Sequence, residues 1–225
     1  MKPNLRAIPH QIEFAIVILI AFGYFIYGSI LTIFTPQHGD SVAQISDAGL
    51  QFLLVYELAA LAALGAFLMV RGWNLQRLGF VPTLRDTVTG IGLAFTGYFA
   101  YIATWIVFSG FTPELGGEGD NFVAPGLSLI NVIFVSVLNP IFEELFVCGY
   151  IIVALRKRRS IFFAINTSVA IRLAYHLYQG TVGIISIIPL GLIFAYWFAK
   201  TGRLWPVVVA HGIMDFLSLM AYVKF

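Results

Sequence analysis

The chain has 225 residues, of which 60% are hydrophobic and only 11% are charged. A typical soluble domain is about half apolar and about a quarter charged, so this composition excludes a disordered chain, a disulfide-linked secreted module and a soluble nucleic-acid-binding protein. The net charge of +2 gives no support to a nucleic-acid partner. The one cysteine, Cys148, cannot form an internal disulfide and leaves the redox compartment open. The composition predicts a polytopic membrane protein.

Seven apolar segments are long enough to cross a bilayer, which takes roughly 20 residues of helix. The segments are continuously apolar, whereas a membrane β-barrel would show alternating segments of about ten residues. The first segment exceeds the apolar region of a signal peptide and lacks a small-residue cleavage site. We therefore expect an all-α membrane protein, a polytopic helical bundle of about seven transmembrane helices in a single domain (residues 1–225). The expected spans are 12–34, 49–70, 87–110, 126–155, 161–178, 181–199 and 205–223.

The basic residues gather on one side of this predicted bundle. Eleven of the 13 Lys and Arg residues precede the first span or lie after the second, fourth and sixth spans, whereas Asp40 and Asp47 lie after the first. Because basic loops stay in the cytosol, we predict a cytoplasmic N-terminus. Arg172, within the fifth span, and Lys224 are the exceptions. The basic cluster at residues 156–159 fits contact with anionic membrane lipids.

Five ionisable residues within the spans are candidates for function, because charge is costly in hydrocarbon and marks functional sites by default. Glu143 and Glu144 are adjacent in the fourth span, so they point about 100° apart and cannot both face one reacting atom. His211 and Asp215 lie one turn apart on one face of the seventh span, and His176 lies in the fifth. Each could be a satisfied structural group, but we expect all five to meet in one cavity that faces the cytosol.

The available groups favour hydrolysis. Cys148 lies about one turn from Glu144. A cysteine nucleophile needs nearby positive charge, so we expect Cys148 to serve packing. The sequence contains neither an HExxH zinc motif nor a glycine-rich phosphate loop. A carboxylate and histidines acting on water remain, either by direct base activation or through metal-bound water. Both predict cleavage of a peptide bond within the membrane.

The C-terminal half of the chain resembles the CAAX protease and bacteriocin-processing family, which includes the type II CAAX prenyl endopeptidases. Residues 143–150 (EELFVCGY) resemble the first family motif, EExxxRG, and residues 176–180 (HLYQG) resemble the second. Residues 191–215, which end in HGIMD, resemble the third, HxxxN or HxxxD. The resemblance covers about residues 139–217, within a motif-bearing core of about 126–223.

The resemblance implies roles for individual residues. Glu143 would activate the attacking water with help from His176, and Glu144 would support the site. His211 and Asp215 match the positions that stabilise the oxyanion of the tetrahedral intermediate. If a metal is bound, its ligands would be Glu143, His176 and His211, with Zn²⁺ as the candidate cofactor. The implied partners are membrane lipids and a protein or peptide substrate, with no nucleic acid.

Two positions depart from the family pattern. Cys148 stands where the first motif has arginine, and we propose that Arg172 supplies the missing charge from the fifth span, because an unpaired arginine in hydrocarbon is costly. Glu57 in the second span is another candidate partner. Asp215 stands where asparagine is commoner. An oxyanion hole needs donors and an ionised aspartate only accepts, so Asp215 must be protonated, orient His211 or bind a metal.

The predicted function is an intramembrane endopeptidase that cleaves membrane-associated or lipid-modified proteins, as a multi-pass protein of a bacterial cell membrane. The alternative is a catalytically impaired member of the same fold that acts as a scaffold or bacteriocin-immunity factor. The lost arginine favours this alternative, and the retained glutamates, histidines and aspartate oppose it. A proton-coupled transporter ranks third, since it would be expected to show inverted repeats or paired broken helices, and the sequence shows neither.

Overall fold

The protein is built from helices. The computed structural model describes residues 8–34, 45–111 and 123–224, and within them only two isolated bridges stand outside helices, turns and loops. The predicted all-α membrane fold is confirmed. The elements are α1 (His10–Phe34), α2 (Asp47–Val70), α3 (Leu84–Phe111), α5 (Leu129–Glu144), the π-helix η2 (Leu145–Tyr150), α6 (Ile151–Leu155), α7 (Ile161–Tyr175), the 3-10 helix η3 (Leu177–Gln179), α8 (Gly180–Thr201) and α9 (Trp205–Met220).

Apolar helices occupy all seven predicted positions when α5, η2 and α6 are counted as one run. The chain is a multi-pass membrane protein. The helices α7 and α9 have only 15 and 16 residues, below the roughly 20 residues of a full span. The predicted ends of the fifth and seventh spans, at 178 and 223, are therefore too far along the chain. Among the residues that the structure describes, five helices are long and apolar enough to cross a membrane: His10–Phe34, Asp47–Val70, Leu84–Phe108, Leu129–Leu155 and Gly183–Thr201.

The fifth helix ends before its histidine. α7 stops at Tyr175, and His176 follows with φ −108° and ψ 6°, outside helical geometry. The expectation that His176 lies inside a helix is therefore wrong. The chain passes through η3 into α8 at Gly180, where φ is +72°, a conformation that glycine adopts without steric cost. His176 thus lies at a helix end, where the backbone changes direction.

The run from α5 to α6 is the most enclosed part of the bundle. In the most apolar stretch of 18 residues in this run, 61% of the residues are buried. In the other four candidate spans this share is at most 33%. Pro140 lies inside α5, where it removes a backbone donor. The π-helix begins directly after Glu143 and Glu144, and all six of its residues are buried. Such π segments interrupt the regular rotation of side chains and are frequent at functional sites.

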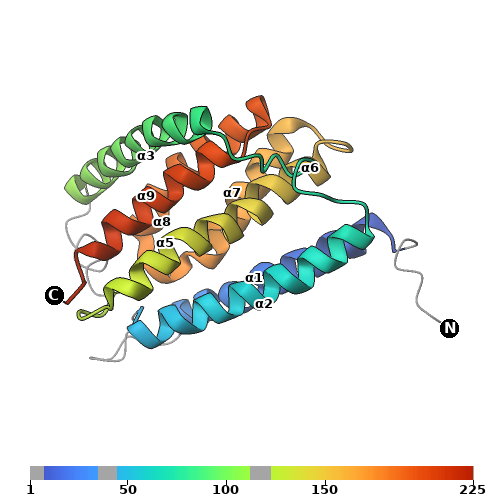
Figure 1. The fold of residues 1–225 in the computed structure, drawn as a ribbon. Helices are drawn as coiled ribbons and strands as arrows, with labels where there is room; N and C mark the ends of the chain where they lie inside the picture. The colour runs from blue at the N-terminus through green and yellow to red at the C-terminus, as the bar shows by residue number, and fades with distance from the viewer. Residues whose placement is uncertain (1–7, 35–44, 112–122, 225) are drawn as a thin grey trace.

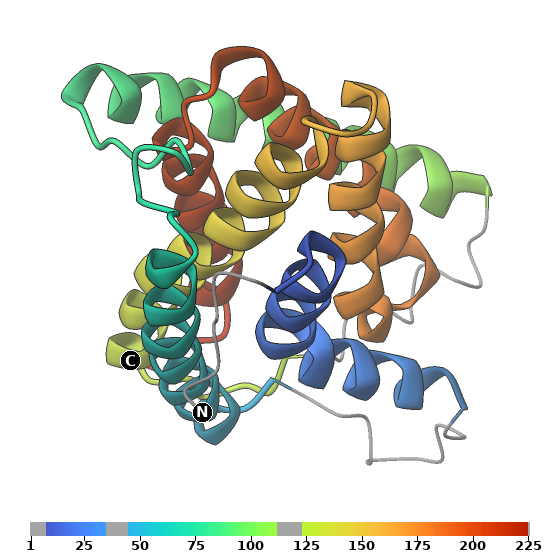
Figure 2. The ribbon, with the colours of Figure 1, turned by 90° about the vertical axis from the view of Figure 1, so that its right-hand side faces the viewer.

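The other helices surround this run. α9 packs between α3 and α5, and α2 packs on another side of α5 (Figure 1). α7 packs against α8 and α1. Figure 2 shows the same bundle end-on, with the α5 run enclosed by α1, α2, α7 and α9. The structure thereby places the two adjacent glutamates near the centre of the bundle.

The two ends of the bundle differ in their connections. One end, at the right of Figure 1, carries the start of α1 and the links after α2, α6 and α8. We call it the basic end, because its described links contain Arg71, Arg77, residues 156–159 and Arg203. The opposite end carries the end of α1, the start of α5, the turn at η3 and the end of α9.

A buried carboxylate fixes the basic end. Glu13 of α1 is 3% exposed, and its side chain accepts hydrogen bonds from Arg71 Nε at 2.6 Å, Trp73 Nε1 at 3.0 Å and Tyr150 OH at 3.1 Å. A second ion pair joins Arg203 to Asp86. These contacts connect α1, α3 and η2 to the links at this end, so the basic end is held by charge as well as by apolar packing.

The packing of α9 on α5 depends on Gly212. A Cβ atom at this position would lie 2.6 Å from the backbone oxygen of Ser136, closer than real side chains come. Since the contact is with backbone, one helix must move to accept a side chain. Gly212 follows His211 directly, so this close approach also sets the distance from His211 to α5.

We predict that Gly212→Ala lowers the free energy of unfolding by about 1–3 kcal/mol, the usual cost of overpacking. Gly92→Ala on α3 is the matched control, because nothing lies within 4 Å of a Cβ there. Thermal unfolding in detergent micelles measures both. Equal stability of the two variants would contradict the close approach of α9 to α5.

Candidate active site

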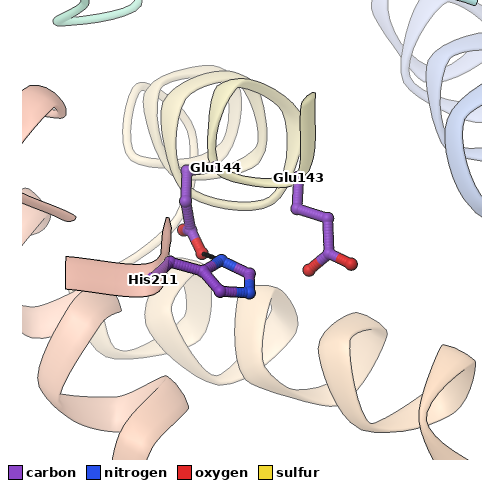
Figure 3. Close-up of side chains that lie close together, drawn as sticks. All are labelled: Glu143, Glu144 and His211. Atoms are coloured by element: carbon purple, nitrogen blue, oxygen red, sulfur yellow. Dashed lines mark hydrogen bonds and ion pairs between the residues drawn. The ribbon is translucent and has the colours of Figure 1, made fainter. Parts of the chain in front are cut away.

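Glu144 is the carboxylate that joins the helices of the site. Its side chain is fully buried and accepts from Arg172 Nη2 at 2.6 Å to Oε1 and 2.8 Å to Oε2. His211 Nδ1 lies 2.8 Å from the same Oε1 (Figure 3). Because an ionised carboxylate only accepts, Nδ1 carries the proton in this contact. Glu144 therefore links α5 to both α7 and α9.

Glu143 leaves the helix in a different direction (Figure 3) and lines a cavity that Glu144 does not reach. Tyr175 OH donates to its Oε2 at 2.6 Å, and Arg172 Nη1 lies 3.6 Å from the same atom. The two adjacent acids therefore differ in access: Glu144 is enclosed by its partners, and Glu143 lines the cavity.

His176 also lines this cavity. Its Nδ1 lies 2.9 Å from the backbone oxygen of Arg172. A carbonyl oxygen can only accept, so Nδ1 is the protonated nitrogen and Nε2 of the neutral ring is left as an acceptor. The contact joins the helix-end histidine to the last turn of α7 and holds its ring in one orientation.

His211 lies between two carboxylates. Its Nε2 is 3.4 Å from Asp215 Oδ1, on the opposite side of the ring from Glu144. Asp215 Oδ2 accepts in turn from Asn139 Nδ2 at 3.1 Å. Three roles were left open for Asp215. These contacts fit the role in which Asp215 orients the ring of His211.

The cavity has a volume of about 690 Å³ and draws its walls from seven helices. The predicted meeting of the fourth, fifth and seventh spans around one cavity is thus present. The lining residues in each helix fall within 22–32 of α1, 49–57 of α2, 98–105 of α3, 135–143 of α5, 172–175 of α7, 183–190 of α8 and 211–219 of α9.

These positions place the cavity along the bundle. In α1, α2, α3, α7 and α8 the lining residues belong to the half that is farther from the basic end, and in the run from α5 to α6 and in α9 they begin near the middle and continue away from it. We expected the cavity to lie on the side of the basic loops, which we predicted to be cytosolic. The space in front of the polar groups extends toward the opposite end, so the cavity and the basic loops do not share an end, and the membrane side of each end stays a prediction.

The charge that the motif lacks comes from α7. The predicted pairing of Arg172 with the adjacent glutamates is confirmed by its contacts with both, and its side chain is only 3% exposed. Cys148 is fully buried, with Glu144, Arg172 and Ser168 among its neighbours, and does not line the cavity. Arg172 therefore places its guanidinium near the position where the family motif would have its own.

Glu57 is not the partner of Arg172. It is 1% exposed and lines the cavity. Neither of its carboxylate oxygens has a hydrogen-bond partner among the described residues. The alternative pairing considered for Arg172 is therefore absent from the structure.

Two further residues of the site were not predicted. Tyr175 directly precedes His176, and Asn139 lies four residues before Glu143, on the same face of α5. The second of these could have been found from that spacing, since Asn139 is polar within an apolar span. Neither residue carries a charge, so neither met the criterion by which the other candidates were chosen.

A group of residues that could bind a metal ion is present, but its members differ from the predicted ligands. Glu143, Glu144 and His211 offer ligand atoms within 4.8 Å of one another, whereas the prediction named His176 in place of Glu144. Glu144 already binds the Arg172 guanidinium through both oxygens and His211 through one. A cation at Glu144 would meet the positive charge of Arg172, so the present arrangement of donors does not fit a resident zinc ion.

Residues 125–217 match the family model described as type II CAAX prenyl endopeptidase Rce1-like. This part of the chain is similar to the type II CAAX prenyl endopeptidases. The predicted resemblance is thereby confirmed, and the matched region contains all five predicted catalytic residues together with Arg172 and Cys148. No curated protein and no solved structure matches the chain.

The match supports a CAAX-type intramembrane protease as the general class for residues 125–217. The matched region begins before α5 and ends within α9, so α1, α2 and α3 lie outside it. Those three helices nevertheless contribute walls to the cavity. The site thus combines residues of the matched region with side chains that the family model does not cover.

We predict that Arg172→Met lowers the free energy of unfolding by about 3–5 kcal/mol, because it leaves a buried carboxylate without its partner. Arg85→Met is the control, since Arg85 is exposed and surface changes usually stay within about 0.5 kcal/mol. Unfolding in detergent micelles measures both.

The double variant Cys148→Arg/Arg172→Leu returns the charge to the position of the family motif. It is expected to recover part of the stability that Arg172→Met loses. If the double variant were no more stable than Arg172→Met, the exchange of charge between the two positions would be refuted.

Proposed function

We propose that the protein hydrolyses a peptide bond of a membrane-associated or lipid-modified protein in the cavity, with Glu143 as the general base. The observation that carries the proposal is the division of roles between the adjacent acids. Glu144 is occupied by Arg172 and His211, while Glu143 and His176 line the same cavity. A base must reach the water whose proton it removes, and Glu143 is the acid of the pair with access to that space.

In this proposal the attacking water is held by Glu143 and by Nε2 of His176. Glu143 removes a proton as the water oxygen attacks the carbonyl carbon of the substrate. The carbonyl oxygen becomes the oxyanion of a tetrahedral intermediate. The proton on Glu143 then passes to the leaving amine nitrogen as the carbon–nitrogen bond breaks, which restores the carboxylate.

His211 is the proposed oxyanion donor. With Nδ1 bonded to Glu144 and Nε2 facing Asp215, two carboxylates stabilise a doubly protonated ring. The Nε2–H of such a ring lies 3.4 Å from Asp215 Oδ1 and would be shared between this carboxylate and the developing negative charge, which provides the donor that an oxyanion hole requires. Asp215, held by Asn139, orients the ring and need not be a donor itself. This arrangement explains how an aspartate can stand where the family more often has asparagine.

The structure supplies no reason to prefer the impaired alternative. Its main support was the arginine lost at Cys148, and Arg172 supplies a guanidinium to the same carboxylates. The bacterial location, the cytoplasmic N-terminus and the single-domain organisation of residues 1–225 stay predictions. Membrane lipids and a protein substrate are the partners that the proposed reaction requires.

We predict that Glu143→Gln lowers the cleavage rate by about 100- to 10,000-fold, the usual contribution of a general base. Its stability should change little, because an amide oxygen can still accept from Tyr175. The assay uses purified protein in proteoliposomes with a panel of prenylated and unmodified peptides.

A control variant and a chelator complete this test. Ser168→Ala is the activity control, because Ser168 donates to a backbone oxygen of η2 and lies outside the cavity. A chelator is expected to leave the wild-type rate unchanged. Cleavage by Glu143→Gln at the wild-type rate would refute the proposed base, and chelator inhibition reversed by Zn²⁺ would refute the metal-free route.

A further inference from the structure

A buried acid on the wall of the cavity has no partner among the described residues. Glu57 of α2 is 1% exposed and lines the cavity, and neither of its carboxylate oxygens has a hydrogen bond within the described chain. Buried polar groups are almost always paired, because an unpaired group has lost its contacts with water without replacing them. An unpaired acid beside a cavity therefore points to a ligand that supplies the missing hydrogen bonds.

Two other buried acids show what a structural role requires in this protein. Glu13 accepts hydrogen bonds from three side chains at the basic end. Glu144 is held by Arg172 and His211. Each of these acids connects separate elements of the bundle through its partners. Glu57 makes no such connection among the described residues, so the described fold makes no use of its polar atoms.

Glu57 lies close to the groups that carry the proposed chemistry. Its charged neighbours are Glu143 on α5 and His211 and Asp215 on α9, and all four residues line the same cavity. The helix α2 packs directly on α5, which brings the two glutamates to one part of the cavity. A peptide bound with its scissile bond at Glu143 would therefore pass beside Glu57.

These observations give Glu57 a role in binding. We propose that Glu57 is a substrate-binding residue whose neutral carboxyl group hydrogen-bonds the backbone of the bound peptide. That the ligand is a substrate rests on the proposed function. That a ligand binds here rests on the burial of Glu57, its missing partners and its place on the cavity wall. Glu57 lies outside the matched region, residues 125–217, so the family model does not cover this contact.

The surroundings of Glu57 favour its neutral form. A carboxylate that is buried without a partner is very costly. Glu143 and Asp215 are themselves acids, so a negative charge on Glu57 would be repelled by theirs. The ring of His211 already contacts Glu144 and Asp215 through its two nitrogens. Glu57 is therefore assigned as the protonated acid.

A neutral carboxyl group matches the backbone of a peptide. It has one O–H donor and one carbonyl acceptor, and an extended peptide offers a carbonyl oxygen and an N–H group. Recognition of a lysine or arginine side chain would need the carboxylate instead. Because the backbone is the same in every peptide, Glu57 holds the chain in register with Glu143 and does not select a side chain.

Peptide affinity tests this contact. In a Glu143→Gln background, which isolates binding from cleavage, Glu57→Leu should raise the Kd for a peptide of the panel by about tenfold, the effect of one hydrogen bond. Glu57→Gln keeps a donor and an acceptor and should retain most of the affinity. An unchanged Kd in Glu57→Leu, or an equal loss in both variants, would overturn the proposal.

A matched control is available on the same helix. Tyr56 precedes Glu57 directly, bonds the backbone of α1 through its hydroxyl group and does not line the cavity. Tyr56→Phe removes this hydroxyl group and should leave the Kd unchanged. A loss of affinity equal to that of Glu57→Leu would mean that any lost polar group on α2 weakens binding, and the assignment to Glu57 would fail.

Changes to the peptide identify the atoms that Glu57 contacts. Replacing single backbone amides by esters near the scissile bond removes one N–H donor at a time and weakens the adjoining acceptor. At one position the ester should weaken binding to the protein that retains Glu57 and leave the Kd of Glu57→Leu unchanged, because the partner is already missing. If every ester weakened both proteins equally, contact with the backbone would be refuted.

The stability of the free protein separates binding from a structural role. Glu57→Leu removes an unpaired buried acid, so it should not lower the unfolding temperature in detergent micelles. A lower unfolding temperature would show that Glu57 has a partner in the free protein, and the proposal would be wrong. None of these measurements depends on cleavage. Peptide binding without hydrolysis by the wild type would therefore contradict only the proposed function.

Discussion

The buried guanidinium of Arg172 is the interaction on which the site depends. It enters from α7 and binds both oxygens of Glu144 on α5, while His211 of α9 binds the same carboxylate. Removing such charges from water is costly unless each is paired with good geometry. The three helices must therefore keep their mutual positions for the pair to be stable. Close contact at Gly212 allows α9 to come within reach, so backbone packing and charge pairing depend on each other.

Because of this pairing, the adjacent residues Glu143 and Glu144 have different surroundings on the two sides of α5. Glu144 faces the partners that neutralise it, and Glu143 emerges about 100° away around the helix, toward the cavity. Tyr175 OH and Nη1 of Arg172 both contact Glu143 Oε2 and hold this side chain in place. An acid held in this way keeps its place without being enclosed. Glu57 lines the same cavity, but neither of its carboxylate oxygens has a hydrogen-bond partner among the described residues.

The parts of the structure that could be predicted are those in which a wrong placement of residues would cost a large free energy. The apolar runs predicted the helices, and the cost of charge in hydrocarbon predicted that Arg172 would meet the glutamates. Tyr175 and Asn139 were missed because a neutral polar group in a helix gives no such signature. The direction in which the cavity extends along the bundle was missed for a geometric reason. Glu143 lies 13 residues from the start of the basic cluster at Arg156 and 14 from the start of α5, about 20 Å from either end, so depth along the helix could not indicate which way the cavity opens.

In this chain the positive charge beside Glu144 comes from α7 and not from the helix that carries the first motif, where Cys148 stands. Supplying it from α7 has a further consequence, because the backbone oxygen of Arg172 also accepts from His176 Nδ1. The side chain of one residue thus neutralises the supporting acid while its backbone orients the histidine that faces the cavity. A displacement of α7 would disturb both at once, so in this chain the charge balance of the core and the geometry proposed for water activation are coupled through Arg172.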